Sequence, residues 1–213
     1  MRRVILAPGI GAQLTERLAE RLDEAADWLS ELDGATGDGD HGVNMRKGLQ
    51  LARTRLGAGA DLGTALQVVG DTLLDDVGGA TGPLYGVFFQ AAAATVRGRS
   101  TLVAIDVQGM LEAGRDAVVA LGGAKTGDKT MVDVLSPALD AFVQADKTEG
   151  LGVALTVLAE KACQARDATA GFVARLGRAS RLADRSLGHV DAGAASCTVI
   201  LCCLSSVLSE HVQ

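Results

Sequence analysis

The stretch LTERLAERLDEAADWLSELDG, residues 14–34, decides the fold class. Its apolar residues recur every three or four positions, with acidic and basic side chains between them: Leu14, Leu18, Leu22, Ala25 and Leu29. An α-helix has about 3.6 residues per turn, so this spacing places them in one stripe along a helix. The pattern predicts an amphipathic helix that ends near Asp33-Gly34.

The same helical spacing recurs through the rest of the chain. Glycine-containing breaks separate further expected helices at about 43–56, 62–77, 84–97, 103–121, 130–145, 151–175 and 193–211. Clear period-two alternation, the signature of a strand, is missing from the sequence. We therefore expect an all-α fold of about eight helices, with antiparallel neighbours, in a single domain spanning residues 1–213.

Composition excludes several classes of function. Aromatic residues make up only 3% of the chain, so small aliphatic side chains must fill the core. The net charge of −6, without a basic run, argues against a nucleic-acid partner. Four cysteines lack a C-x-x-C pair, which favours reduced, buried thiols in a cytoplasmic protein: Cys163, Cys197, Cys202 and Cys203.

One segment, AGAASCTVILCCLSSVL at 192–208, is apolar enough to be considered for a membrane. Its Ser, Thr and Cys content and its marginal length favour a buried core helix. The apolar run at the N-terminus is too short for a secretory signal. We expect no membrane partner.

The most unusual residues lie in the expected connections between helices. These connections are GATGDGDHG (34–42), GGATGPLYG (78–86), GGAKTGDKTM (122–131) and GRASRLADRSLGHVDAG (177–193). Alternate connections of an antiparallel bundle emerge at the same end. The first three can therefore form one site.

Asp33, Asp38 and Asp40 stand in a D-x4-D-x-D pattern whose glycines let the backbone fold tightly. Converging carboxylates repel one another, and a divalent cation such as Mg²⁺ bound between them would compensate their charge. Single Asp-Gly pairs are also ordinary turn and helix-cap signals, so that alternative stays open. An EF-hand is excluded, because Val43 and Leu49 stand where its glycine and glutamate are required.

Two of the glycine-rich connections invite a phosphate-binding interpretation. GGATGPLYG offers the free backbone N–H groups of a helix start, with Pro83 suited to the first turn. GGAKTGDKTM is close to the P-loop motif, but Asp128 occupies the position of the P-loop lysine, and a preceding strand is lacking. We interpret that second match as coincidental.

The fourth connection carries Arg178 and Asp191. Arg178 can neutralise a phosphate, and Asp191 can accept a hydrogen bond from an amino group or a ribose hydroxyl. A solvated basic loop with a helix cap at Asp191 is an equal alternative.

Together, GDGDHGVNM (37–45), GGATGPLYG, GAKTGDKTMVDVLSPAL (123–139) and ARLGRASRLADRSLGHVDAG (174–193) resemble the nucleotide-binding L subunits, or L domains, of dihydroxyacetone kinases. The resemblance runs across nearly the whole chain. It implies an eight-helix antiparallel barrel with a Mg²⁺-bound nucleotide, ADP or ATP, at one end.

The resemblance also implies roles for individual residues. It places two Mg²⁺ ions on Asp33, Asp38 and Asp40. It places nucleotide contacts at His41, Asn44, Met45, Ala80, Thr81, Gly122, Met131, Arg178, Asp191, Ala192 and Gly193. The chain departs from the family pattern at Thr81, where serine is usual, and at Ala192, where proline is usual. The second departure puts the rigidity of the 191–193 turn in doubt.

By the same resemblance the chain is half an enzyme, without a catalytic residue of its own. The family's substrate histidine lies on a partner K subunit, and bound ADP is rephosphorylated by a phosphotransferase-type M subunit. A chain that starts at Met1 with no room for a K domain fits this mode. Two alternatives are an ATP-dependent triose or tetrose kinase subunit and the nucleotide-binding module of a fatty-acid-kinase-like system. A homodimer is compatible with all three.

Overall fold

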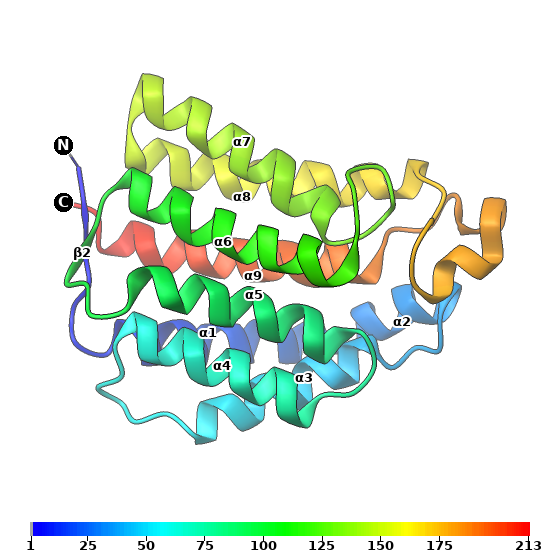
Figure 1. The fold of residues 1–213 in the computed structure, drawn as a ribbon, viewed down its shortest axis with the longest axis horizontal. Coiled ribbons are helices and arrows are strands. Elements are labelled where there is room, and N and C mark those ends of the chain that lie inside the picture. The colour runs from blue at the N-terminus through cyan, green and yellow to red at the C-terminus, as the bar shows by residue number, and fades with distance from the viewer. Residues whose placement is uncertain (1) are drawn as a thin grey trace.

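The computed structural model describes residues 2–213, and these form a bundle of long helices (Figure 1). The α-helices are α1 (Ile10–Glu24), α2 (Ala26–Thr36), α3 (His41–Thr54), α4 (Leu62–Asp76), α5 (Thr81–Val96), α6 (Ala104–Gly122), α7 (Val132–Glu149), α8 (Leu151–Ala168) and α9 (Ala192–Glu210). The shorter elements are the 3-10 helices η1 (Thr169–Gly171) and η2 (Arg178–Ser186) and the antiparallel strand pair β1 (Val4–Ile5) and β2 (Thr101–Leu102).

The helix expected over residues 14–34 is interrupted once. Ala25 separates α1 from α2, yet its backbone stays in the right-handed helical region (φ −87°, ψ −7°). The two helices therefore form one interrupted rod. Counted as one, they bring the nine α-helices of residues 2–213 to the eight that the periodicity predicted.

These eight rods close into a ring. Each rod packs against the next one along the chain, beginning with α1 against α3 and ending with α8 against α9. The ring is closed because α9 also packs against α1. Figure 1 shows the long helices running along the long axis of the molecule. The predicted all-α class is confirmed. The two-residue strands are too short to leave a period-two signal.

Small residues allow the close helix packing that the composition predicted. At the α4–α5 crossing, a Cβ on Gly70 would lie 3.0 Å from the carbonyl oxygen of Gly86. The apolar α9 is a core helix, as expected, with 72% of its most apolar window buried inside the protein. It is the one helix within residues 2–213 that is long and apolar enough to cross a membrane.

The helix expected over 151–175 ends earlier, at Ala168, so that boundary was wrong. The Thr169 hydroxyl donates to the Arg166 carbonyl, and the Thr169 carbonyl accepts a hydrogen bond from the ammonium of Lys129. The same carbonyl also accepts the Phe172 N–H at 3.0 Å, so the chain tightens into η1 there, and Lys129 holds that turn. Periodicity alone cannot reveal such a contact.

All four unusual connections emerge at the end of the ring opposite the two termini (Figure 1). The light-blue link between α2 and α3 and the orange η2 segment lie there together. Alternation of connections along an antiparallel bundle predicted a common end only for the first three. Helix packing brings the fourth to the same place.

Candidate functional site

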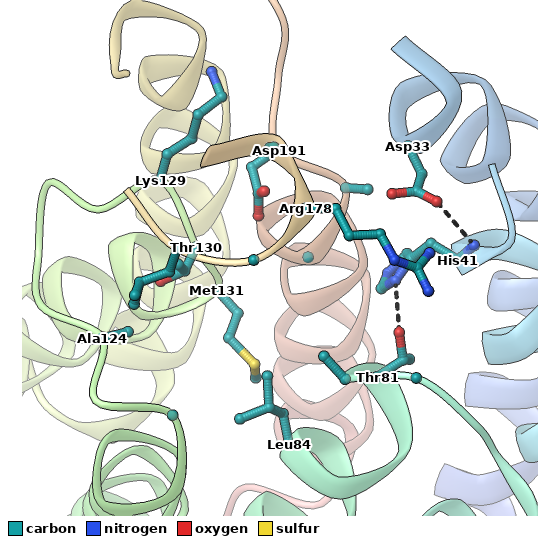
Figure 2. Close-up of a pocket in the computed structure, with 18 of the residues that line it drawn as sticks. Asp33, His41, Thr81, Leu84, Ala124, Lys129, Thr130, Met131, Arg178 and Asp191 are labelled. Atoms are coloured by element: carbon teal, nitrogen blue, oxygen red, sulfur yellow. Dashed lines mark hydrogen bonds between the residues drawn. The ribbon is translucent and has the colours of Figure 1, made fainter. Parts of the chain in front are cut away.

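The four connections surround a cavity of about 470 Å³. Its wall comes from the α2–α3 connection, the start of α5, the end of α6 with the following loop, residues 176–179, and the start of α9. Figure 2 looks into it, with Asp33, His41 and Thr81 on one side and Ala124, Leu84 and Met131 on the other. The cavity thus has a polar half and an apolar half.

Three helices begin at this cavity. The first residues of α3, α5 and α9 are His41, Thr81 and Ala192, and all three line the wall. The first turn of a helix has backbone N–H groups without helical partners, and its dipole is positive at that end. Three such ends around one cavity favour an anion such as phosphate.

The predicted carboxylate cluster is present in the fold. Asp33 lies in the last turn of α2, Asp38 in the connection and Asp40 immediately before α3. One oxygen from each lies within 4.8 Å of the others. A Cβ on Gly37 would lie 2.5 Å from Asp33 Oδ1 and 3.1 Å from the Asp33 carbonyl oxygen, so glycine lets the connection fold closely onto Asp33.

Arg178 of η2 lies against this cluster. Its guanidinium contacts the Asp38 carboxylate and lies 3.8 Å from Asp40 Oδ1. A cation therefore already sits where the carboxylates converge. The donor set of three carboxylate groups is of the hard-oxygen kind that Mg²⁺ prefers, so the residues present fit a divalent cation.

His41 is buried and held by hydroxyls on both sides. Its Nδ1 lies 3.1 Å from Thr81 Oγ1, and its Nε2 lies 2.8 Å from Ser196 Oγ. Ser196 in turn contacts the Tyr85 hydroxyl at 2.6 Å. Burial lowers the pKa of His41, against the opposing effect of nearby Asp33 and Asp40.

Sequence reasoning missed Tyr85 and Ser196. Each left a weak signal, because Tyr85 is the only tyrosine of the chain and lies inside the GGATGPLYG motif. Ser196 is a buried polar residue one helical turn into the mostly apolar α9. Neither signal indicates the other, since the two residues are 111 positions apart.

The apolar half of the wall was also missed. It is formed by side chains from α5, α6, the 122–131 loop and the segment just before η2: Leu84, Val118, Leu121, Ala124, Met131 and Leu176. Of these residues, only Met131 was expected from the sequence. Such a wall suits a flat, weakly polar group placed beside the anion site.

Asp191 caps the start of α9, where its carboxylate accepts the Ala194 N–H at 2.7 Å. It also lines the cavity. Burial raises its pKa to about 6, and the cap hydrogen bond opposes that shift. The helix-cap interpretation and the site interpretation are therefore both compatible with its position.

Lys129 does not serve as a P-loop lysine in this fold. Its ammonium donates to the carbonyls of Thr169 and Phe172 at 2.7 and 3.1 Å, and to that of His189. Figure 2 shows the side chain directed away from the middle of the cavity. The loop follows helix α6, not a strand, so the P-loop match is coincidental in geometry as well.

The remaining predicted residues divide into two groups. Ala80, Gly122, Ala192 and Gly193 line the cavity with those already described, and Asp38 lies exposed at the carboxylate cluster beside it. Asn44 and Met45 do not line the cavity. Met45 is fully buried in the core, because it stands one helical turn from Leu49 on the apolar stripe of α3. Nucleotide contacts at Asn44 and Met45 stay predictions without a supporting contact.

Known proteins resemble this chain over most of its length. It is 38% identical over 197 residues to the ADP-binding subunit DhaL of the PEP-dependent dihydroxyacetone kinase of Escherichia coli K12, covering 91% of this chain and 94% of the relative. It is 37% identical over 191 residues to the L-erythrulose 1-kinase of Mycolicibacterium smegmatis, covering 86% of this chain but 32% of that kinase.

The fold has a counterpart among solved structures. The crystal structure of the dihydroxyacetone kinase from C. freundii in complex with AMP-PNP and Mg²⁺ matches with a TM-score of 0.69 at 24% identity. The match covers 95% of this chain and 34% of that one, so the chain spans about a third of that kinase. The DAK2 domain model matches residues 35–206, and the chain therefore belongs to the DAK2 domain family.

Proposed function

We propose that this chain is the ADP-binding subunit of a dihydroxyacetone kinase, holding a Mg²⁺-bound nucleotide for phosphoryl transfer to a small ketose. One observation carries the proposal: the carboxylates, Arg178 and three helix starts converge on one cavity. The full-length similarity to an ADP-binding subunit supports the choice of nucleotide.

The two halves of the cavity suggest how the nucleotide lies. Its phosphates belong at the polar half, near Thr81, Arg178 and the carboxylate cluster. Its base belongs against the apolar wall of Leu84, Val118 and Met131. In this arrangement Asp33, Asp38 and Asp40 hold Mg²⁺, which when bound neutralises charge that develops on the transferring phosphoryl group.

The chain's own residues bind and orient the nucleotide but supply no acceptor for the phosphoryl group. His41 is the histidine at the cavity, and hydroxyls already engage both of its ring nitrogens. We therefore assign His41 to nucleotide binding. The ketose and its binding histidine then belong to a partner K subunit, and the bound ADP is rephosphorylated by a phosphotransferase-type subunit in the cytoplasm.

The second candidate is the nucleotide-binding module of an ATP-dependent triose or tetrose kinase. The similarity to an L-erythrulose 1-kinase favours it, although the chain covers only 32% of that protein. Nucleotide exchange separates the two. A subunit that retains ADP through turnover fits the first candidate, and one that releases ADP and takes up ATP in each cycle fits the second.

Calorimetry of the purified chain with ADP and Mg²⁺ tests the shared part of both candidates. We expect binding that requires Mg²⁺ and is lost in Asp38→Asn, which keeps the shape of the side chain but removes its charge. The matched control is Asp75→Asn, an exposed aspartate at the end of α4. Absence of heat and of any thermal shift with the unmodified chain would refute the proposal.

A further inference from the structure

A row of hydrogen-bonding groups leads from the cavity into the protein interior. It starts at Thr81 Oγ1 and continues through the His41 ring, Ser196 Oγ and the Tyr85 hydroxyl to the carbonyl of Gly193. Thr81 is partly exposed at the cavity, whereas His41, Tyr85 and Ser196 are 8%, 2% and 0% exposed. The row joins α3, α5 and α9, the three helices that begin at the cavity.

Counting protons gives this row two self-consistent directions. Each hydroxyl carries one proton, and a neutral imidazole carries one N–H. In the inward direction Tyr85 donates to the Gly193 carbonyl at 2.9 Å, Ser196 donates to Tyr85, and the His41 ring donates from Nε2 to Ser196. Thr81 then donates to Nδ1 and has no proton left for the cavity.

In the outward direction every proton points the other way. Tyr85 donates to Ser196, Ser196 donates to His41 Nε2, and the ring donates from Nδ1 to Thr81. The Thr81 hydroxyl proton is then free to face the cavity. This direction gives up the bond to the Gly193 carbonyl and gains a donor where an anion would lie.

The geometry favours a continuous row over a broken one. Ser196 can also donate to the carbonyls of Ala192 and Gly193, but both lie at 3.2 Å. Its contacts with Tyr85 and His41 are shorter, at 2.6 and 2.8 Å. Hydrogen bonds in such a buried chain polarise one another, so the protons are expected to reorient together.

We propose that an anionic oxygen bound at Thr81 reverses the direction of this row, so that Thr81 donates to the anion and His41 changes from the Nε2–H to the Nδ1–H tautomer. Tyr85 and Ser196 are then positioning residues, which set the proton on His41 without touching the ligand. The driving force is the exchange of a neutral hydrogen bond to Gly193 for a charge-assisted one, which is about twice as strong. The inference rests on the proposed function, since it takes the anion to be a nucleotide phosphate.

Nitrogen-15 NMR of labelled histidine side chains tests the proposal directly. A variant lacking His189 and His211 leaves His41 as the single signal, since the chain has three histidines. We expect Nε2–H in the free protein and with adenosine, and Nδ1–H with ADP and Mg²⁺. An unchanged tautomer in protein that binds Mg²⁺-ADP overturns this inference alone. Failure to bind Mg²⁺-ADP overturns both it and the proposed function.

A second measurement uses Ser196→Ala, which cuts the row at its middle. Without the Ser196 hydroxyl, His41 can change tautomer while Tyr85 keeps its hydrogen bond to Gly193. We therefore expect affinity for Mg²⁺-ADP to rise by roughly three- to tenfold, the value of that one hydrogen bond, while adenosine affinity stays the same. Ser205→Ala is the matched control, because Ser205 is buried in the same helix and donates to the Leu155 carbonyl. An affinity of Ser196→Ala for Mg²⁺-ADP that is equal to or lower than that of Ser205→Ala, or equal changes for ADP and adenosine, would refute the positioning role. If Ser196→Ala does not fold, the NMR result alone decides.

Discussion

Lys129 provides the sharpest test of how the site end of the molecule is held together. The side chain is 2% exposed, and its ammonium donates to three backbone carbonyls. Lys129→Met keeps the length and apolar character of the stem but removes all three donors. Those carbonyls lie 40, 43 and 60 residues further along the chain, so the substitution removes hydrogen bonds that connect distant segments.

The expected loss follows from these contacts. A hydrogen bond from a charged donor contributes about 1.5–3 kcal/mol. Two of the three contacts are only partly buried, so water can replace part of the loss, and we expect a total of about 3–5 kcal/mol. For a chain of this size each kcal/mol lowers Tm by about 2–4 °C, which predicts a fall of roughly 6–20 °C.

Thermal unfolding followed by far-UV circular dichroism measures this effect. The control is Lys125→Met in the same loop, where Lys125 is exposed and makes no ion pair among residues 2–213. A Tm for Lys129→Met equal to that of the control would refute the structural role. Affinity for Mg²⁺-ADP, measured well below either Tm, should stay nearly unchanged. Its complete loss would instead support the P-loop interpretation.

Three further perturbations follow from the same structure. The pKa of Asp191 is raised from 3.8 to about 6, so folding favours the protonated acid. Urea unfolding should therefore show Asp191→Asn gaining about 3 kcal/mol relative to the unmodified protein as pH rises from about 3 to 7. A constant difference would contradict the shift. A Cβ at Gly42 would lie 1.8 Å from a backbone carbonyl oxygen of α2. Chemical denaturation should therefore show Gly42→Ala lowering the free energy of unfolding by about 1–3 kcal/mol. The control Gly109→Ala, which has open space around its Cβ, should instead stabilise α6 slightly. Arg178→Gln should strengthen Mg²⁺ binding to the nucleotide-free protein, because a competing cation is removed, and should weaken ADP binding. Calorimetry with each ligand should show affinity changes of opposite sign. A loss of affinity for both ligands would count against the assigned role.

Much of the fold could be predicted because its signals are local. The leucine stripe that begins at Leu14 and the apolar run at 192–208 each determine a helix through neighbours within one or two turns. The boundaries that failed depend on contacts from elsewhere. The helix expected to reach residue 175 stops at Ala168, next to a threonine whose carbonyl accepts hydrogen bonds from both the Phe172 N–H and the distant Lys129 ammonium.

The residues of the candidate site also differ in how far they could be predicted from local sequence. Asp33, Asp38 and Asp40 lie within eight residues of one another, and glycines between them allow the turn, so their convergence was readable from spacing. The contact between Tyr85 and Ser196 could not be predicted, because nothing in the local sequence around either residue indicates the other.

The sequence by itself determined the helices, the carboxylate cluster and the helix starts, since each depends on the conformational preferences of adjacent residues. Only the tertiary structure decided that Arg178 faces the carboxylates and that His41 reaches Ser196, 155 positions away. It also decided that an apolar wall completes the cavity. The physical reason is that closing the ring depends on the summed burial of the stripes of all its helices, so residues meet at its end through packing that no single segment encodes.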